Sequence, residues 1–269
     1  MLDIIYSYVR FCDNEIILQL LLYYKNKKAI STLDLHQQIS IEKYKILTNT
    51  KYSHNINKYL INEFNKNDIN INIVKYLVEH GVDINEETLY DITPIFEACS
   101  SGNEALVKYL VEHGVDINKG YNDNETLLIK ACEDGNLELV KYLVEHGADI
   151  NEKDGIDETP LIKACEDENL KLVKYLVEHG ADINKENIQK KTSLFYSCSN
   201  GNETVVKYLV EHGANINKSN NIGETPLFYS CSNGNEIVVK YLVEHGANIN
   251  KSNYIGETPF FFLHVKTGI

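Results

Sequence analysis

The sequence predicts an all-α solenoid, in which helix-turn-helix units stack side by side and carry extended, β-hairpin-like fingers. Two observations predict it. The phrase VKYLVEHGADIN, or a close spelling of it, begins at Val74, Val107, Val140, Val173, Val206 and Val239, always 33 residues apart. Five cysteines recur at the same interval, each after a small residue in an apolar stretch. Self-similarity at a fixed period of about 20–50 residues is typical of repeat architectures.

The first half of a unit predicts a short helix. In the unit from Thr93, the threonine is suited to cap the first free N–H groups, and Pro94 loses nothing at the first helical position. An apolar face follows over residues 95–99. Ser101, Gly102 and Asn103 then end the helix.

The second half predicts a longer helix and a finger. Residues 104–113 place Leu106, Val107, Leu110 and Val111 at the spacing of one buried helical face. Gly114 follows where a left-handed cap is wanted. Residues 115–118 alternate in polarity as an extended finger would. Because neither helix buries its apolar side alone, the units must stack.

These residues resemble the ankyrin repeat family. The resemblance rests on the Thr-Pro openings at Thr93, Thr159, Thr225 and Thr258, the Ala-Cys pairs, the Gly-Asn turn and the Gly-Ala-Asp-Ile-Asn close. It predicts six repeats over residues 58–257 and a truncated half-repeat over 258–269. The histidine that the family usually places two residues after the proline is replaced by an apolar residue in every unit.

Two regions depart further from the pattern. Residues 1–57 are predicted to be helical, either as decayed repeats or as a cap on the first repeat. In the fingers, Gly223 and Gly256 keep the family's glycine, and Asn124 and Asp157 tolerate a left-handed backbone at that position. Lys190 is less suited, so its finger is the most doubtful in geometry.

The composition restricts the class of partner. A formal charge of −13 argues against general nucleic-acid binding and against adhesion to an anionic membrane. The apolar runs are far shorter than the roughly 20 residues of a spanning helix, and the first residues lack a signal-peptide pattern. We therefore expect an intracellular protein of the cytoplasm or nucleus, without membrane insertion.

The cysteines predict buried free thiols. Cys99, Cys132, Cys165, Cys198 and Cys231 would lie on adjacent repeats, about 8–10 Å apart. A disulfide needs Cα atoms within about 7 Å, and one thiolate per unit cannot complete a tetrahedral metal site. No metal and no cofactor are expected.

Two further residue types repeat in register. A histidine precedes each capping glycine, where it is expected to meet the last carbonyls of the helix rather than a metal. A tyrosine four residues earlier is expected to pack on the next repeat with its hydroxyl in water. Lys130 and Lys163 are expected to pair with acidic residues three and four positions later, on a solvated helix face.

The residues that vary between copies are the candidates for recognition, since a solenoid shares its scaffold. Neutral drift is the alternative at each position. The family resemblance implies binding through the exposed side of the first helix and the finger tips. By position, the helix residues are Glu97, Lys130, Lys163, Tyr196, Tyr229 and Phe262. The tips are Tyr90, Tyr121, Asn122, Asp154, Ile188, Gln189, Asn221, Ile222, Tyr254 and Ile255.

The function predicted is that of a non-catalytic scaffold that binds another protein through these residues, with Tyr196 and Tyr229 on one recognition surface. No catalytic constellation stands out. The alternatives are an enzyme or adaptor function in residues 1–57, with the repeats as its targeting module, and a structural spacer.

The last half-repeat predicts self-association. Phe260, Phe261, Phe262 and Leu263 follow Pro259, which makes this unit more apolar than the one before it. An array exposes apolar surface at an uncapped end. The alternatives are that a partner or further repeats cover this end, or that Phe260 and Phe261 are completely buried.

Overall fold

The computed structural model of the protein describes residues 71–79, 82–85, 93–121 and 123–261, so the region 1–57 and Phe262 lie outside it. The chain forms two compact units, Met1–Val115 and Asp116–Ile269. The described part is helical and contains no β-strand beyond one isolated bridge, between Tyr121 and Glu125. The predicted all-α solenoid of helix pairs is confirmed.

The first unit contributes three described helices. They are α5 (Ile71–Glu79), α6 (Pro94–Ser100) and α7 (Glu104–Glu112). The Tyr109 hydroxyl of α7 donates to the carbonyl of Lys75 in α5 at 3.4 Å, and the Lys75 ammonium lies 5.1 Å from the centre of the Tyr109 ring. These two contacts join α5 to α7 within the first unit.

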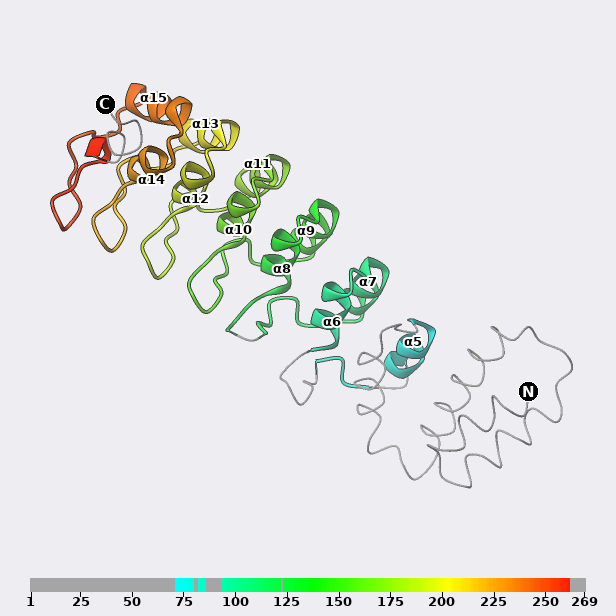
Figure 1. Cartoon of the computed structure of the whole chain (residues 1–269). Coiled ribbons are helices and arrows are strands. Elements are labelled where there is room, and N and C mark those ends of the chain that lie inside the picture. The colour runs from blue at the N-terminus through cyan, green and yellow to red at the C-terminus, as the bar shows by residue number, and fades with distance from the viewer. Residues whose placement is uncertain (1–70, 80–81, 86–92, 122, 262–269) are drawn as a thin grey trace, which may run out of the picture. The chain divides into compact units, whose positions relative to one another are not determined.

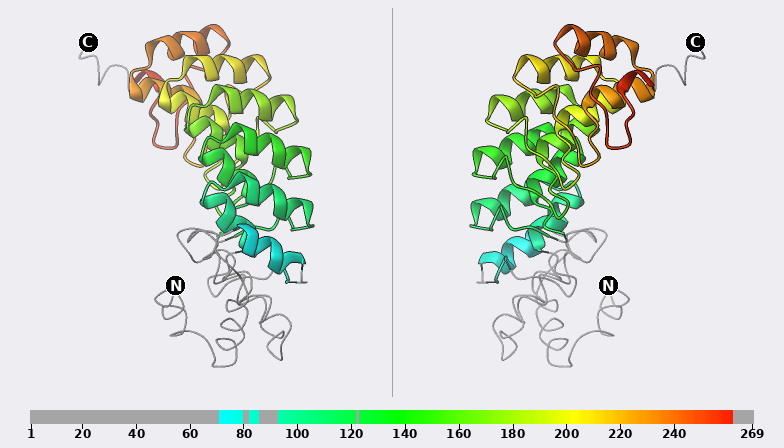
Figure 2. Two further views of the ribbon diagram at one scale, coloured as in Figure 1. Left: turned by 90° about the vertical axis from the view of Figure 1, so that its right-hand side faces the viewer. Right: turned by 90° about the vertical axis from the view of Figure 1, so that its left-hand side faces the viewer.

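The second unit stacks four helix pairs. They are α8 (Leu127–Glu133) with α9 (Leu137–Glu145), α10 (Pro160–Glu166) with α11 (Leu170–Glu178), α12 (Ser193–Asn200) with α13 (Glu203–Glu211), and α14 (Pro226–Asn233) with α15 (Glu236–Glu244). The first helices form one layer and the second helices another, and the fingers project beside the first helices (Figures 1 and 2).

Capping residues explain where the helices begin and end. Thr126 and Thr159 accept a hydrogen bond from the third N–H of α8 and α10. The asparagine before each of the second helices α7, α9, α11 and α13 accepts the equivalent bond from its own helix. After the second helices, Gly147 and its equivalents adopt the left-handed cap, with φ of 92° at Gly147. Leu127 and Ser193 begin helices without proline. Thr126 caps α8 through its side chain, whereas Thr192 precedes α12 without a side-chain capping hydrogen bond.

The apolar face of each helix forms a continuous core. Leu139, Val140 and Leu143 of α9 are buried, as are their equivalents in α7, α11 and α13. The five cysteines are buried and free, as predicted. Burial raises the pKa of the Cys165 and Cys198 thiols to about 12, so these side chains act as small apolar groups.

An asparagine joins each repeat to the next. The Asn118 side chain donates to the carbonyl of Gly147 at 3.1 Å and accepts from the N–H of Asp149 at 2.8 Å. Asn151, Asn184 and Asn217 repeat this pair of bonds. The prediction of an extended conformation here was wrong, because Asp116 accepts from the N–H of Asn118 and closes a turn instead.

The histidines and tyrosines of the second helices stack in pairs. The Nδ1 atom of His146 lies 2.7 Å from the carbonyl oxygen of Tyr142, and the two ring centres are 4.0 Å apart. The predicted contact with the last carbonyls is confirmed. The predicted water contact of the tyrosine hydroxyls was wrong for Tyr175, Tyr208 and Tyr241, whose oxygens are buried. Each ring lies against a histidine and the neighbouring repeat, which encloses its hydroxyl.

Two repeats place a long side chain where the backbone is left-handed. Lys190 has φ of 58° and its finger keeps the regular turn, with the N–H of Lys190 donating to the carbonyl of Asn187 at 2.8 Å. The doubt about this finger was therefore misplaced. Glu168 also has φ of 58°, at the position that is Gly135 or Gly201 in neighbouring repeats. Such a backbone costs roughly 1–2 kcal/mol for a residue with a Cβ atom.

We predict that Glu168→Gly raises the free energy of unfolding by about 1 kcal/mol, because glycine adopts this conformation without the Cβ penalty. Urea denaturation followed by circular dichroism measures it. The control Glu168→Ala removes the carboxylate but keeps the Cβ atom, so it should give no such gain.

The reciprocal change, Gly135→Ala, should lower the free energy of unfolding by a similar amount. An added Cβ atom would meet only the Asn169 amide nitrogen at 3.5 Å, so the effect isolates the backbone. A Glu168→Gly protein no more stable than Glu168→Ala would contradict the prediction.

Candidate protein-binding surface

One side-chain position opens four successive fingers of the second unit and fixes their shape. It holds Asp154, Asn187, Asn220 and Asn253 in successive fingers. The Asn187 side-chain oxygen accepts from the N–H groups of Gln189 and Lys191 at 2.9 and 3.0 Å. Asp154 makes the equivalent two bonds and is 11 % exposed, so its predicted place at a tip was wrong. A carboxylate this well supplied with backbone donors holds the base of the finger instead.

Backbone hydrogen bonds join successive finger tips. The N–H of Ile188 donates to the carbonyl of Ile156 (3.1 Å), that of Asn221 to Gln189 (3.0 Å), and that of Tyr254 to Ile222 (3.0 Å). Four fingers, which follow one another along the stack in Figure 1, are therefore held in fixed register.

The tips present large apolar side chains to solvent. We define the finger ridge as Ile156 (46 % exposed), Ile188 (59 %), Ile222 (50 %), Tyr254 (79 %) and Ile255 (78 %). The sequence predicted all of these except Ile156. The left-handed Asp157 aligns with Gly223, and this alignment could have located the tip one residue before it.

The predicted first-helix residues occupy one equivalent position in successive repeats. Lys130, Lys163, Tyr196 and Tyr229 lie on α8, α10, α12 and α14. We call the first-helix surface on which these four side chains lie the groove. Glu97 lies half-exposed on α6 of the first unit. Tyr121 lies half-buried on a finger arm, and its N–H and carbonyl pair with Glu125 at 2.8 and 2.7 Å.

The two lysines of the groove differ in their partners. Lys130 pairs with Glu133 at 3.6 Å and Asp134 at 3.1 Å, as predicted. Lys163 instead reaches Glu158 at 2.7 Å, Glu133 at 3.3 Å and Asp154 at 3.5 Å, so the predicted pairs within its own helix were wrong. Its side chain is only 12 % exposed, and an ammonium in that place is stabilised most by the enclosed carboxylates around it.

Glu158 connects Lys163 to Tyr196. The Tyr196 hydroxyl donates to the Glu158 carboxylate at 2.6 Å, and the Asn187 amide donates to both, at 3.2 Å to Glu158 and 2.8 Å to Tyr196. Burial by itself would raise the pKa of Glu158, but the bonds from Lys163 and Tyr196 outweigh it and hold the pKa below its usual value. We call these four residues the Glu158 network. The sequence carried no signal for Glu158 or Asn187.

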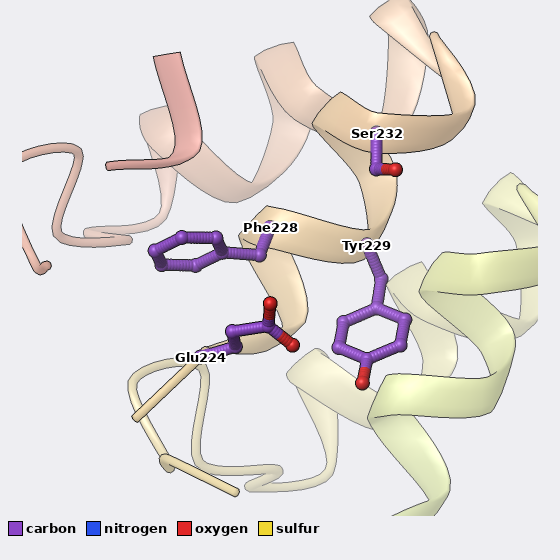
Figure 3. Close-up of a pocket in the computed structure, with 4 residues that line it drawn as sticks. All are labelled: Glu224, Phe228, Tyr229 and Ser232. Carbon is purple, nitrogen blue, oxygen red and sulfur yellow. The ribbon is translucent and has the colours of Figure 1, made fainter. Parts of the chain in front are cut away.

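The groove changes beyond Tyr196. The Tyr229 ring meets Phe195 edge-on with centres 5.5 Å apart, and the Lys191 ammonium lies 4.9 Å from the Tyr229 ring centre. A hollow of about 140 Å³ opens beside it, lined by Glu224, Phe228, Tyr229 and Ser232. Figure 3 shows Phe228 and Tyr229 diverging from α14 around this space.

Comparison with known families agrees with this architecture. The model described as ankyrin repeats (3 copies) matches residues 8–120, 65–154, 119–187 and 153–220, and that described as ankyrin repeats (many copies) matches 200–243. The chain belongs to the ankyrin repeat family. No curated protein matches it.

Ankyrin repeats are generally protein–protein interaction modules and typically non-catalytic scaffolds. Within the described residues of this chain, no helix is both long and apolar enough to cross a membrane. The same residues contain no cluster of three or more His, Cys, Asp or Glu side chains placed to hold a metal ion.

We predict that Glu158→Gln lowers the free energy of unfolding by about 2 kcal/mol near pH 7, because Lys163 loses its closest charged partner while remaining enclosed. The matched control is Glu138→Gln, whose pair with Lys141 is at 2.8 Å but 72 % exposed on the glutamate side. An exposed pair of this kind contributes roughly 0–1 kcal/mol.

The pH dependence follows from the lowered pKa of Glu158. Its stabilisation is fully present above the ordinary pKa of a glutamic acid, about 4.3, and is lost as the pH falls through the lower folded-state value. The difference between the unmodified protein and Glu158→Gln should therefore shrink at acidic pH. Urea denaturation across this range tests it, and a difference independent of pH would count against the network.

Proposed function

We propose that the ankyrin repeats of residues 116–261 bind another protein through the finger ridge and the groove. The observation that carries the proposal is the finger ridge, in which hydrogen-bonded neighbours hold exposed apolar side chains in register. Exposed apolar surface of this kind is typical of interaction sites. Because the fingers are already ordered, binding would lose little conformational entropy.

The groove residues take different parts in this proposal. Tyr254 belongs to the ridge, and Tyr229 lines the hollow beside it. Lys163 and Tyr196 hold the scaffold through Glu158 and offer their remaining surface to the partner. Lys130 and Tyr121 are proposed as further contacts of the second unit, and Glu97 as a contact of the first unit. Phe262 is proposed as a contact of the last half-repeat.

We predict that Ile188→Ser with Ile222→Ser removes partner binding and leaves the fold intact, since both side chains project from the tips. The control is Ile237→Ser with Val243→Ser, which removes exposed apolar side chains (64 % and 39 %) from α15. Affinity capture from an extract of the native cell, with quantitative mass spectrometry, compares them. The unmodified chain and the control should capture the same proteins. The ridge variant should capture at least about fivefold less of them.

Equal capture by all three proteins would place the binding elsewhere. Capture of nothing specific would favour the structural spacer. If only residues 1–57 retain the captured proteins, the working part lies there and the repeats serve as a targeting module.

A second association is proposed for the last half-repeat. Phe260 and Phe261 are 44 % and 52 % exposed, so the alternative of complete burial is contradicted. We propose that a second copy of the chain covers them, since rings of this size are the main source of apolar association.

We predict that the unmodified chain associates with rising concentration in sedimentation velocity, and that Phe260→Ser with Phe261→Ser removes the association. Ile237→Ser serves as the control, since it removes an exposed apolar side chain from a different helix, α15. A chain that stays monomeric at high concentration, or a variant that associates equally, would refute this second proposal.

A further inference from the structure

The groove of residues 116–261 has two chemically different halves. Where α8 and α10 end, it carries Glu133, Asp134, Glu166 and Asp167. At the same positions, α12 and α14 carry Ser199, Asn200, Ser232 and Asn233. In the finger ridge, Ile156 lies on the finger before α10, and Ile188 and Ile222 lie on the fingers before α12 and α14. One segment bound along the ridge would therefore pass from one chemistry to the other.

The first half, which we call the acidic half, holds more negative charge than its own lysines neutralise. Seven carboxylates interact with Lys130 or Lys163: Glu125, Glu133, Asp134, Asp154, Glu158, Glu166 and Asp167. The Lys163 ammonium is already enclosed by three of them. The excess therefore remains available to charges from outside the chain.

Burial and neighbouring negative charge both act on the titration of Glu166 and Asp167 in the acidic half. Burial first, and then the charge of Glu158, raises the pKa of Glu166. Burial and the charges of Glu133 and Asp134 raise the pKa of Asp167. A positive group brought beside them would relieve this repulsion, so the acidic half is electrostatically complementary to a cation.

The second half, which we call the tyrosine half, offers apolar and aromatic surface instead. The hollow of about 140 Å³ has Phe228 and Tyr229 in its wall. The exposed Ile222, Tyr254 and Ile255 of the ridge follow along the same repeats. Lys191 already lies over the Tyr229 ring, so the remaining surface favours an uncharged side chain.

We propose that the groove binds a segment of a partner protein with lysine or arginine over α8 and α10 and an apolar side chain over α12 and α14. This inference rests on the proposed function and adds the partner's chemistry and direction. Arginine fits best, since its planar guanidinium makes paired, charge-assisted hydrogen bonds to carboxylates. The charge pattern fixes which end of the segment lies over which half of the groove. The opposite placement would bring the segment's cation beside Lys191 and the hollow.

Selection from a displayed library of short random peptides tests the inference without knowing the partner. The unmodified full chain should enrich peptides that combine Lys or Arg with an apolar residue at fixed spacing. Glu166→Gln with Asp167→Asn should lose the basic enrichment and keep the apolar one. The control, Glu145→Gln with Glu178→Gln, removes exposed carboxylates from α9 and α11 and should select as the unmodified chain does.

A selected peptide, made synthetically, then gives the affinity. The acidic-half variant should weaken it by roughly fivefold, and the control should not. Added salt should weaken binding to the unmodified chain more than to that variant.

The outcomes separate the two proposals. Peptides that need Ile188 and Ile222 but show no basic enrichment would overturn the inference and leave the proposed function standing. Enrichment of acidic residues would also overturn it. Selected peptides whose binding does not depend on the ridge, or failure to select any, would count against both.

Discussion

The fold depends on one constraint, which is that no helix of a repeat buries its apolar side without a neighbour. Leu172, Val173 and Leu176 of α11 are fully buried, and α11 contacts both α9 in the repeat before it and α13 in the repeat after it. The asparagine pair of bonds, as from Asn118 to Gly147 and Asp149, fixes the spacing at which this burial occurs. Every repeat meets the same requirement, and this explains why the phrase that supplies these residues recurs almost unchanged.

The same constraint separates scaffold from recognition, but not completely. The finger tips are free to vary because they lie outside the shared core. The first helices, by contrast, have one side in the core and the other on the groove. Lys163 and Tyr196 illustrate this, since each varies between repeats and yet contributes to the Glu158 network. A substitution of Tyr196 would therefore alter the packing between two repeats as well as the binding of any partner. Substitutions in the finger ridge, by contrast, should change binding with little effect on the core.

Periodicity made the fold predictable from the sequence, since helix bounds, caps and buried thiols all repeat at 33 residues. The candidate binding surface was less predictable from the sequence. The sequence identified Ile222 and Tyr254 as finger tips by their position in the ankyrin pattern, but it placed Asp154 at a tip and missed Ile156. The partners of Lys163 could not be predicted either, because Glu133 reaches it from α8 of the preceding repeat and Glu158 from the finger before α10. Such contacts depend on side-chain directions across an interface, which the spacing within one repeat does not determine.

The Glu158 network also lies in a segment that contains three left-handed residues other than glycine. Asp157, Glu168 and Lys190 all adopt left-handed conformations in the segment from Asp154 to Lys191, at positions that glycine occupies in other repeats. Each long side chain there costs roughly 1 kcal/mol or more, so this segment needs compensation from its contacts. The hydrogen bonds of Glu158 to Lys163, Tyr196 and Asn187 link finger to finger across this segment and offset that strain. The boundary between the acidic and tyrosine halves of the groove therefore coincides with the part of the stack held by polar contacts. A partner that spans both halves would bind across the network and stabilise it further.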